Sequence, residues 1–181
     1  MCVMCMLYTV CGFTEYFRYV FFLQIWPLFR DCCVVAKKEL KYAGPFGLAL
    51  YLCGATFVDR ATEKGRQAVN NAGKKAKANG TSLFLFPEGT RNSKGGGELL
   101  NFRKGAFHVA LDAKMPILPI VVSEYEFLGP TRHDQFPGGD ITIQVLPAID
   151  TDDFKKEDID DLIKKTRDCM TVALNSCPKQ N

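Results

Sequence analysis

Histidine, metal-binding cysteine patterns and long apolar runs are all scarce in this sequence. Among 181 residues only two histidines occur, His108 and His133. The eight cysteines include no C-x-x-C pair that is matched by a second pair or by histidines. This pattern argues against a zinc site and predicts no bound metal. We expect free, buried thiols in a protein that works in a reducing compartment.

Charge and motif content exclude two further classes of protein. The net charge is only +3, and no block of Lys and Arg appears, so we expect no nucleic-acid partner. The glycines of "NSKGGGE" are not followed by Gly-Lys-Ser/Thr, which argues against an ATP-binding loop. Repeats and low-complexity linkers are also missing, and the length suits one main domain.

The first 30 residues form an apolar segment rich in aromatic side chains. Its two apolar runs, "MCVMCMLYTVCGF" and "YVFFLQIWPLF", contain 13 and 11 residues, fewer than the roughly 18 of a transmembrane span. The aromatic content favours a segment at a membrane surface, and a buried core helix fits equally well. We therefore treat residues 1–30 as a separate, membrane-associated segment and residues 31–181 as the main domain.

Strand and helix patterns alternate after residue 30. This order predicts an α/β domain with a mixed, largely parallel central sheet flanked by helices. We expect "TFV", "LFLF" and "ILPIVV" to be neighbouring central strands, with helices on both faces. The predicted strands are 32–36, 55–58, 82–86, 116–122 and 141–149, and the predicted helices are 45–54, 62–79, 103–113 and 152–175.

Polar residues follow two of these strands directly. Arg60 comes after "ATFVD", and the run from Glu88 to Arg91 comes after "LFLFP". Ligands of open α/β sheets gather at the carboxyl ends of strands, and the arginine fork suits phosphate. Arg103 and Lys104 add positive charge at the start of the next helix. The pattern indicates an anion site, although a simple Arg60–Glu88 ion pair explains it as well.

Three segments in series resemble one known family. "FPEGTR" is similar to a signature of the glycerolipid acyltransferases, the PlsC-like family that includes 1-acyl-sn-glycerol-3-phosphate acyltransferases. Upstream, "KKELKYAGPFGLALYLCGATFVDR" resembles the family's second block. Downstream, "FRKGAFHVALDAKMPILPIVVSEY" resembles its final block. The resemblance extends over residues 31–147.

The resemblance implies a reaction, a membrane setting and a set of site residues. The family transfers an acyl chain from acyl-CoA, a co-substrate, to lysophosphatidate, which gives phosphatidate and needs no cofactor. The setting is phospholipid synthesis at the endoplasmic reticulum membrane, with the catalytic domain facing a reducing compartment. The apolar stretch 46–57 would line an acyl-chain channel or be ordinary core. The implied phosphate-binding residues are Arg60, Glu88, Gly89, Thr90, Arg91 and Lys104.

The family's first block, Asn-His-x-x-x-x-Asp, has no counterpart here. Its histidine acts as the general base and its aspartate orients the imidazole. The expected place is around 10–17, where the chain reads "VCGFTEYF". Glu15 lies there, but an exposed glutamate has too low a pKa to replace the histidine.

Neither histidine of the chain replaces the missing block. His108 stands four residues before Asp112 and fits a packing helix, and His133 lies in a loop rich in Gly and Pro. We can identify no catalytic residue. The sequence thus predicts a truncated or alternatively spliced, catalytically compromised acyltransferase. A non-catalytic lipid-phosphate binding or regulatory module is the alternative.

Overall fold

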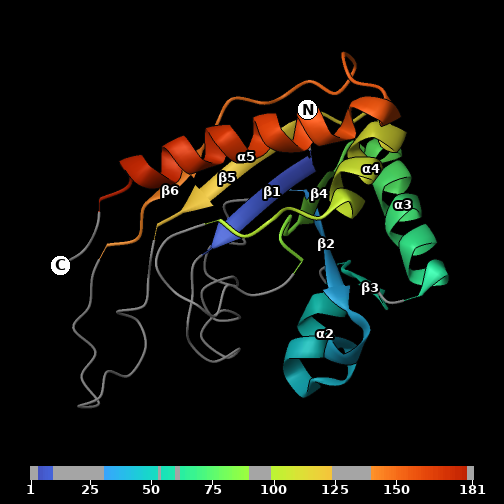
Figure 1. Cartoon of the computed structure of the whole chain (residues 1–181). Coiled ribbons are helices and arrows are strands. Elements are labelled where there is room, and N and C mark those ends of the chain that lie inside the picture. The colour runs from blue at the N-terminus through green and yellow to red at the C-terminus, as the bar shows by residue number, and fades with distance from the viewer. Residues whose placement is uncertain are drawn as a thin grey trace.

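The fold is organised around one six-stranded sheet. The computed structural model describes residues 4–9, 31–52, 54–59, 62–89, 99–123 and 140–178. The strand order is β3-β2-β4-β1-β5-β6 (Figure 1). The pairings from β3 across to β5 are parallel, and β6 runs antiparallel to β5, so the predicted mixed, largely parallel sheet is confirmed. The strands are β1 Met4–Thr9, β2 Cys32–Lys37, β3 Thr56–Val58, β4 Ser82–Leu85, β5 Ile117–Val122 and β6 Ile143–Val145.

The predicted order of the central strands is wrong. The "TFV" strand, β3, is at the edge of the sheet, and β2 separates it from β4. A further strand, β1, lies between β4 and β5. Parallel strands are joined by long crossovers, so adjacency in sequence does not reveal which strands pair.

The strand β1 also corrects the expectation for the start of the chain. The apolar run that was read as a membrane segment or a core helix contributes Met4–Thr9 to the centre of the sheet. A short apolar run does not distinguish a buried strand from a helix by periodicity. The sheet therefore includes residues that the sequence analysis assigned to the separate segment 1–30. Residues 10–30 lie outside the described part of the chain.

The helices follow the sequence signals more closely. Thr62 caps α3, because its Oγ1 accepts a hydrogen bond from the N–H of Gly65 at 3.1 Å, as is usual for an N-cap threonine. Only the last helix departs clearly from the prediction: a turn and a short 3-10 helix occupy the residues up to 158. The helices are η2 Lys38–Tyr42, α2 Gly44–Leu52, α3 Glu63–Ala78, α4 Lys104–Ala113, η4 Lys156–Asp158 and α5 Ile159–Ser176.

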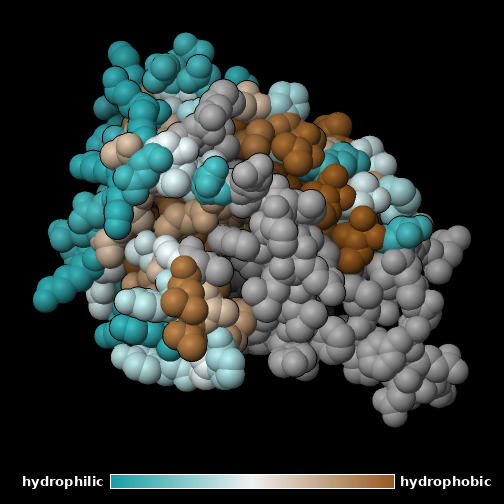
Figure 2. Space-filling model, turned by 180° about the vertical axis from the view of Figure 1, so that it is seen from behind, coloured by the Kyte–Doolittle hydropathy of each residue, from teal (hydrophilic) through white to brown (hydrophobic). Residues whose placement is uncertain are grey.

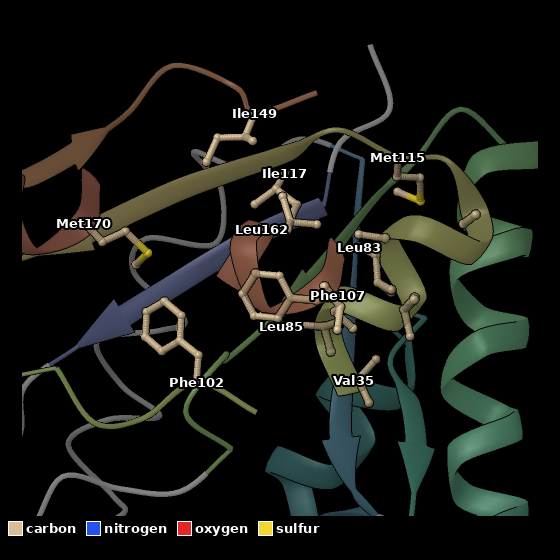
Figure 3. Close-up of a cluster of buried hydrophobic side chains, with 14 of the residues drawn as sticks. Val35, Leu83, Leu85, Phe102, Phe107, Met115, Ile117, Ile149, Leu162 and Met170 are labelled. Atoms are coloured by element: carbon tan, nitrogen blue, oxygen red, sulfur yellow. The ribbon is translucent and has the colours of Figure 1, made fainter. Parts of the chain in front are cut away.

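One continuous hydrophobic core joins three of the helices to one face of the sheet. Phe107 of α4 is fully buried among Leu83 and Leu85 of β4 and side chains of α5 such as Leu162 (Figure 3). The described helices α3, α4 and α5 pack on this face. The predicted helices on the opposite face are not among the described elements, and α2 packs against η2 instead.

Helices α3 and α4 approach each other closely at Gly73. A Cβ atom there would lie 2.5 Å from Cγ1 of Val109 on α4. We therefore expect Gly73→Ala to lower the free energy of unfolding by about 1–3 kcal/mol, because the extra methyl overpacks the core. Urea unfolding measures this change.

Gly105→Ala is the matched control. A Cβ atom at Gly105, in the first turn of α4, meets nothing within 4 Å, so alanine there is expected to leave stability unchanged or raise it by up to about 1 kcal/mol. Equal losses from the two alanines would contradict the close helix contact.

Candidate functional site

Two of the predicted site residues lie where the chain leaves β4. Glu88 and Gly89 follow β4 and lie within the described residues. The neighbouring Thr90 and Arg91, and Arg60 after β3, lie outside them. The structure therefore describes the base of the turn and the segment that leads into α4, whereas three of the predicted phosphate-binding residues stay predictions.

Glu88 is a buried carboxylate that ties this turn to the segment before α4. Its side chain is only 6% exposed, and its Oε1 accepts a hydrogen bond from the N–H of Leu100 at 2.6 Å. The backbone N–H of Arg103 donates to the carbonyl of Pro87 at 2.8 Å. Buried charge needs such partners. The two hydrogen bonds hold the chain at Pro87–Glu88 against the chain at Leu100–Arg103. They therefore join the two ends of the loop that contains Arg91.

Gly89 allows an arginine to lie directly against the turn. The residue has φ +63, and a Cβ atom there would stand 2.7 Å from Cδ of Arg103. The Nε–H of Arg103 donates to the carbonyl of Glu88 at 3.3 Å. Any side chain at position 89 would be strained by the backbone and would displace Arg103. The glycine thus lets a guanidinium group lie beside the turn.

Lys104 points in another direction. Its Nζ forms an ion pair with Asp160 of α5, at 2.7 Å from Oδ1 and 2.8 Å from Oδ2. Both side chains are more than half exposed. Of the two cations at the start of α4, Arg103 is therefore the one that contacts the turn, and a phosphate contact by Lys104 stays a prediction.

The five parallel strands, β1 to β5, all end at the same edge of the sheet. Met6 of β1 pairs with Leu85 of β4, and Lys37 of β2 pairs with Val58 of β3. Since these strands are parallel, their carboxyl ends face one side. The turn with Glu88 follows β4 at this edge, whereas the segment from residue 10 and Arg60, which follow β1 and β3 in the sequence, lie outside the described residues. This is the edge at which open α/β sheets bind ligands.

Asp112, which stands four residues after His108 on α4, is engaged by another side chain. Asp112 makes an ion pair with Lys156, with 2.6 Å between Oδ1 and Nζ. Hydrogen bonding and the charge of Asp112 raise the pKa of Lys156. His108 is half-buried on α4 between Phe107 and Val109, which belong to the core. His133 lies outside the described residues.

Arg167 of α5 is a supporting residue that the sequence analysis missed. Its Nη2 donates to the carbonyl of Leu99 at 2.8 Å, next to the amide that holds Glu88. Its Nε is buried and has no acceptor within the described ranges. Arg167 is 76 positions after Arg91 and outside the three recognised segments, so only the tertiary structure reveals the contact. Helix α5 thus helps to hold the base of the loop.

A comparison with known protein families identifies the family of this chain. A family model described as "Acyltransferase" matches residues 16–123, more than half of the chain and including both the turn after β4 and the whole of α4. The chain belongs to this acyltransferase family, which confirms the resemblance seen in the sequence.

Similar proteins from different organisms are named for the same activity. A human protein named 1-acyl-sn-glycerol-3-phosphate acyltransferase beta is 34% identical over 154 residues, which are 83% of this chain and 55% of the relative. The Saccharomyces cerevisiae 1-acyl-sn-glycerol-3-phosphate acyltransferase is 37% identical over 146 residues, 79% of this chain and 48% of the relative. The chain therefore spans about half the length of the curated relatives it matches.

A solved structure has the same fold. The crystal structure of the 1-acyl-sn-glycerophosphate (LPA) acyltransferase PlsC from Thermotoga maritima superposes with a TM-score of 0.71, at 21% identity, and the match covers 99% of this chain and 69% of that one. This likeness supports the predicted α/β architecture and carries no further argument.

Removing the Arg167 contact should loosen the base of the loop. A lost hydrogen bond from a charged donor costs about 1.5–3 kcal/mol. We expect Arg167→Ala to speed amide hydrogen exchange in a peptide that covers residues 99–103, measured by mass spectrometry, while the core strand β5 stays protected.

Lys164→Ala, an exposed change on the same helix, is the control and should leave that exchange unchanged. If Arg167→Ala left exchange at 99–103 at its original rate, or accelerated β5 equally, α5 would have no specific hold on this segment.

Proposed function

We propose that this protein acts on lysophosphatidate as a glycerolipid acyltransferase or as a derivative of one. The observation that carries the proposal is the anchored turn after β4, with Glu88 buried as the carboxylate and Arg103 laid against Gly89. The family membership and the activity for which the relatives are named support the same substrate.

The phosphate of the substrate would bind above this turn. Arg91 and Arg60 follow the carboxyl ends of β4 and β3 in the chain, at one edge of the sheet. The amino end of α4 begins beside the turn, and its free N–H groups and dipole favour an anion. Glu88, being acidic and engaged with Leu100, would shape the turn and would not itself touch the phosphate.

In the complete reaction the free hydroxyl of lysophosphatidate attacks the thioester carbonyl of acyl-CoA. A C–O bond forms, the C–S bond breaks, the CoA thiolate leaves, and a base accepts the hydroxyl proton. The segment 10–17 that should supply this base directly follows β1, the neighbour of β4, and contains no histidine. This absence favours the second candidate function, a module that binds the lipid phosphate without turning it over.

We also propose that the protein works at a membrane surface of the endoplasmic reticulum, with acyl-CoA as the donor. The lipid nature of the proposed substrate supports that setting. Within the described residues, no helix combines the length and apolar character needed to cross a bilayer.

The proposed phosphate site, with Arg91, Arg60 and Arg103 around the turn after β4, is called the cradle below. It predicts a ranking of arginine and lysine variants. Arg91→Ala and Arg103→Ala should each weaken lysophosphatidate binding by roughly 10- to 100-fold, since a charge-assisted contact is worth about 1.5–3 kcal/mol. Lys104→Ala should have a smaller effect because Asp160 already holds that ammonium. Isothermal titration with a short-chain, dispersed lysophosphatidate measures the affinities.

Arg66→Ala supplies the control, since Arg66 pairs with Glu63 on the exposed side of α3. A loss as large for Arg66 as for Arg91 would mean that binding depends on overall charge and that the turn after β4 is no phosphate site.

The missing base predicts binding with little turnover. The chain should transfer acyl groups to lysophosphatidate at a rate near the uncatalysed background. The triple variant Cys11→Asn, Gly12→His, Phe17→Asp rebuilds Asn-His-x-x-x-x-Asp after β1. It should raise the rate by about 10²-fold or more, the usual contribution of general-base catalysis. Release of free CoA thiol gives the rate.

The double variant Cys11→Asn, Phe17→Asp lacks the added imidazole and should stay inactive. His108→Ala should lower stability without changing any residual rate, because its neighbours are core residues. Rapid transfer by the unaltered chain, abolished by His108→Ala in a folded protein, would overturn this account.

A further inference from the structure

Exposed large apolar side chains concentrate on one short segment of the protein. Six such residues occur in the described part of the chain, and four of them lie within η2 and α2. Figure 2 shows a hydrophobic strip over this part of the molecule. The side chains are Tyr42, Leu48, Tyr51 and Leu52, which are 77%, 58%, 61% and 74% exposed. We call this set the η2–α2 surface.

The sequence of α2 offers no polar face that would explain this exposure. The helix, "GPFGLALYL", contains no charged residue. A helix that is apolar on all sides normally lies in a protein core or in lipid. Here only Gly47 and Leu50 are buried, so most of the apolar surface faces outward.

The surface is also hollowed, and its two helices pack closely. An open hollow of about 450 Å³ is lined by Lys41, Tyr42, Gly44, Gly47, Leu48 and Tyr51. Gly47 lets α2 approach η2 so closely that a Cβ atom there would stand 2.5 Å from the carbonyl oxygen of Leu40. The two glycines open the hollow, while aromatic and leucine side chains form its walls.

Positive charge borders the apolar side chains. Lys37, Lys38 and Lys41 are exposed at the start of this segment, against a single acidic residue, Glu39. Tyrosine at an apolar edge, with lysines beside it, is the pattern that places a segment at the lipid–water boundary. A protein partner with an apolar face would not require the lysines, whereas an anionic lipid surface would attract them.

We propose that the η2–α2 surface docks on an anionic lipid bilayer. Leu48 and Leu52 enter the acyl-chain boundary, the tyrosines lie at the level of the headgroups, and Lys38 and Lys41 contact lipid phosphates. The inference deepens the proposed function, since it rests on a protein that works at a membrane and names the surface that meets it. Because η2 and α2 directly follow β2, docking through them would hold the carboxyl edge of the sheet, where the site lies, near the lipid.

Vesicle co-sedimentation of the full chain tests this surface. The probes are vesicles of phosphatidylcholine alone and vesicles with phosphatidylserine added. Phosphatidylserine is used because its headgroup, unlike that of phosphatidate, offers no phosphomonoester to the proposed cradle. Leu48→Ser combined with Leu52→Ser should lower the partition coefficient about tenfold or more. Both changes remove apolar carbon groups that would be buried in the lipid on docking.

Lysine variants measure the electrostatic contribution to vesicle binding separately from the apolar contribution. Lys38→Gln combined with Lys41→Gln should lower partition onto the phosphatidylserine vesicles by about fivefold for each lysine, and should have little effect on phosphatidylcholine alone. Val172→Ser, equally exposed on α5 at 71%, and Lys64→Gln on α3 are the matched controls. All variants change exposed residues, and thermal unfolding checks that they remain folded.

The possible outcomes are distinct. Selective loss in the η2–α2 variants supports the proposal. If the leucine variant, the Val172→Ser control and the unaltered chain partition equally, the η2–α2 surface is not the docking surface. Membrane association itself then still holds. A chain that binds neither vesicle overturns the docking, whereas titration with dispersed lysophosphatidate still tests the cradle. If the leucine changes instead alter the sedimentation coefficient of the protein alone, a second copy covers this surface and the lipid proposal is wrong.

Discussion

The hydrogen bond between the buried Glu88 carboxylate and the Leu100 amide holds the site together. A carboxylate at 6% exposure is stable only when its charge is compensated, and here a backbone N–H at 2.6 Å does part of this. That bond joins the end of β4 to the start of α4 and so fixes both ends of the loop that carries Arg91. The position of Arg103 against Gly89, the support from Arg167 and the placement of the α4 amino end all depend on this closure.

Local sequence signals predicted what local forces determine. The helices predicted at 62–79 and 103–113 and the strands with buried runs follow from patterns of neighbouring residues, and the structure confirms these elements. The central position of β1 was missed because its pairing with β4 and β5 joins residues far apart in the chain. A six-residue apolar run looks the same in sequence whether it forms a buried strand or part of a helix.

In the site, too, features set by neighbouring residues were predicted and features set by distant contacts were not. The turn with Glu88 and Gly89 was found from its composition and its place after a strand, and Gly89 has the positive φ that its residue type suggests. Sequence spacing could not rank Arg103 and Lys104, because their directions depend on Gly89 and on Asp160 of a distant helix. Arg167 carried no local signal, since the Leu99 carbonyl that it contacts lies far away in the sequence.

The position of β1 also has a consequence for synthesis on the ribosome. This strand leaves the exit tunnel before the rest of the sheet, but its partners are residues 83–85 and 117–122. Both edges of β1 are unpaired until β4 has been made, and one edge stays unpaired until β5 follows, a state that invites pairing with other chains. The central strand thus waits for partners made much later in the chain, whereas a strand of a hairpin meets its partner as soon as the next few residues follow.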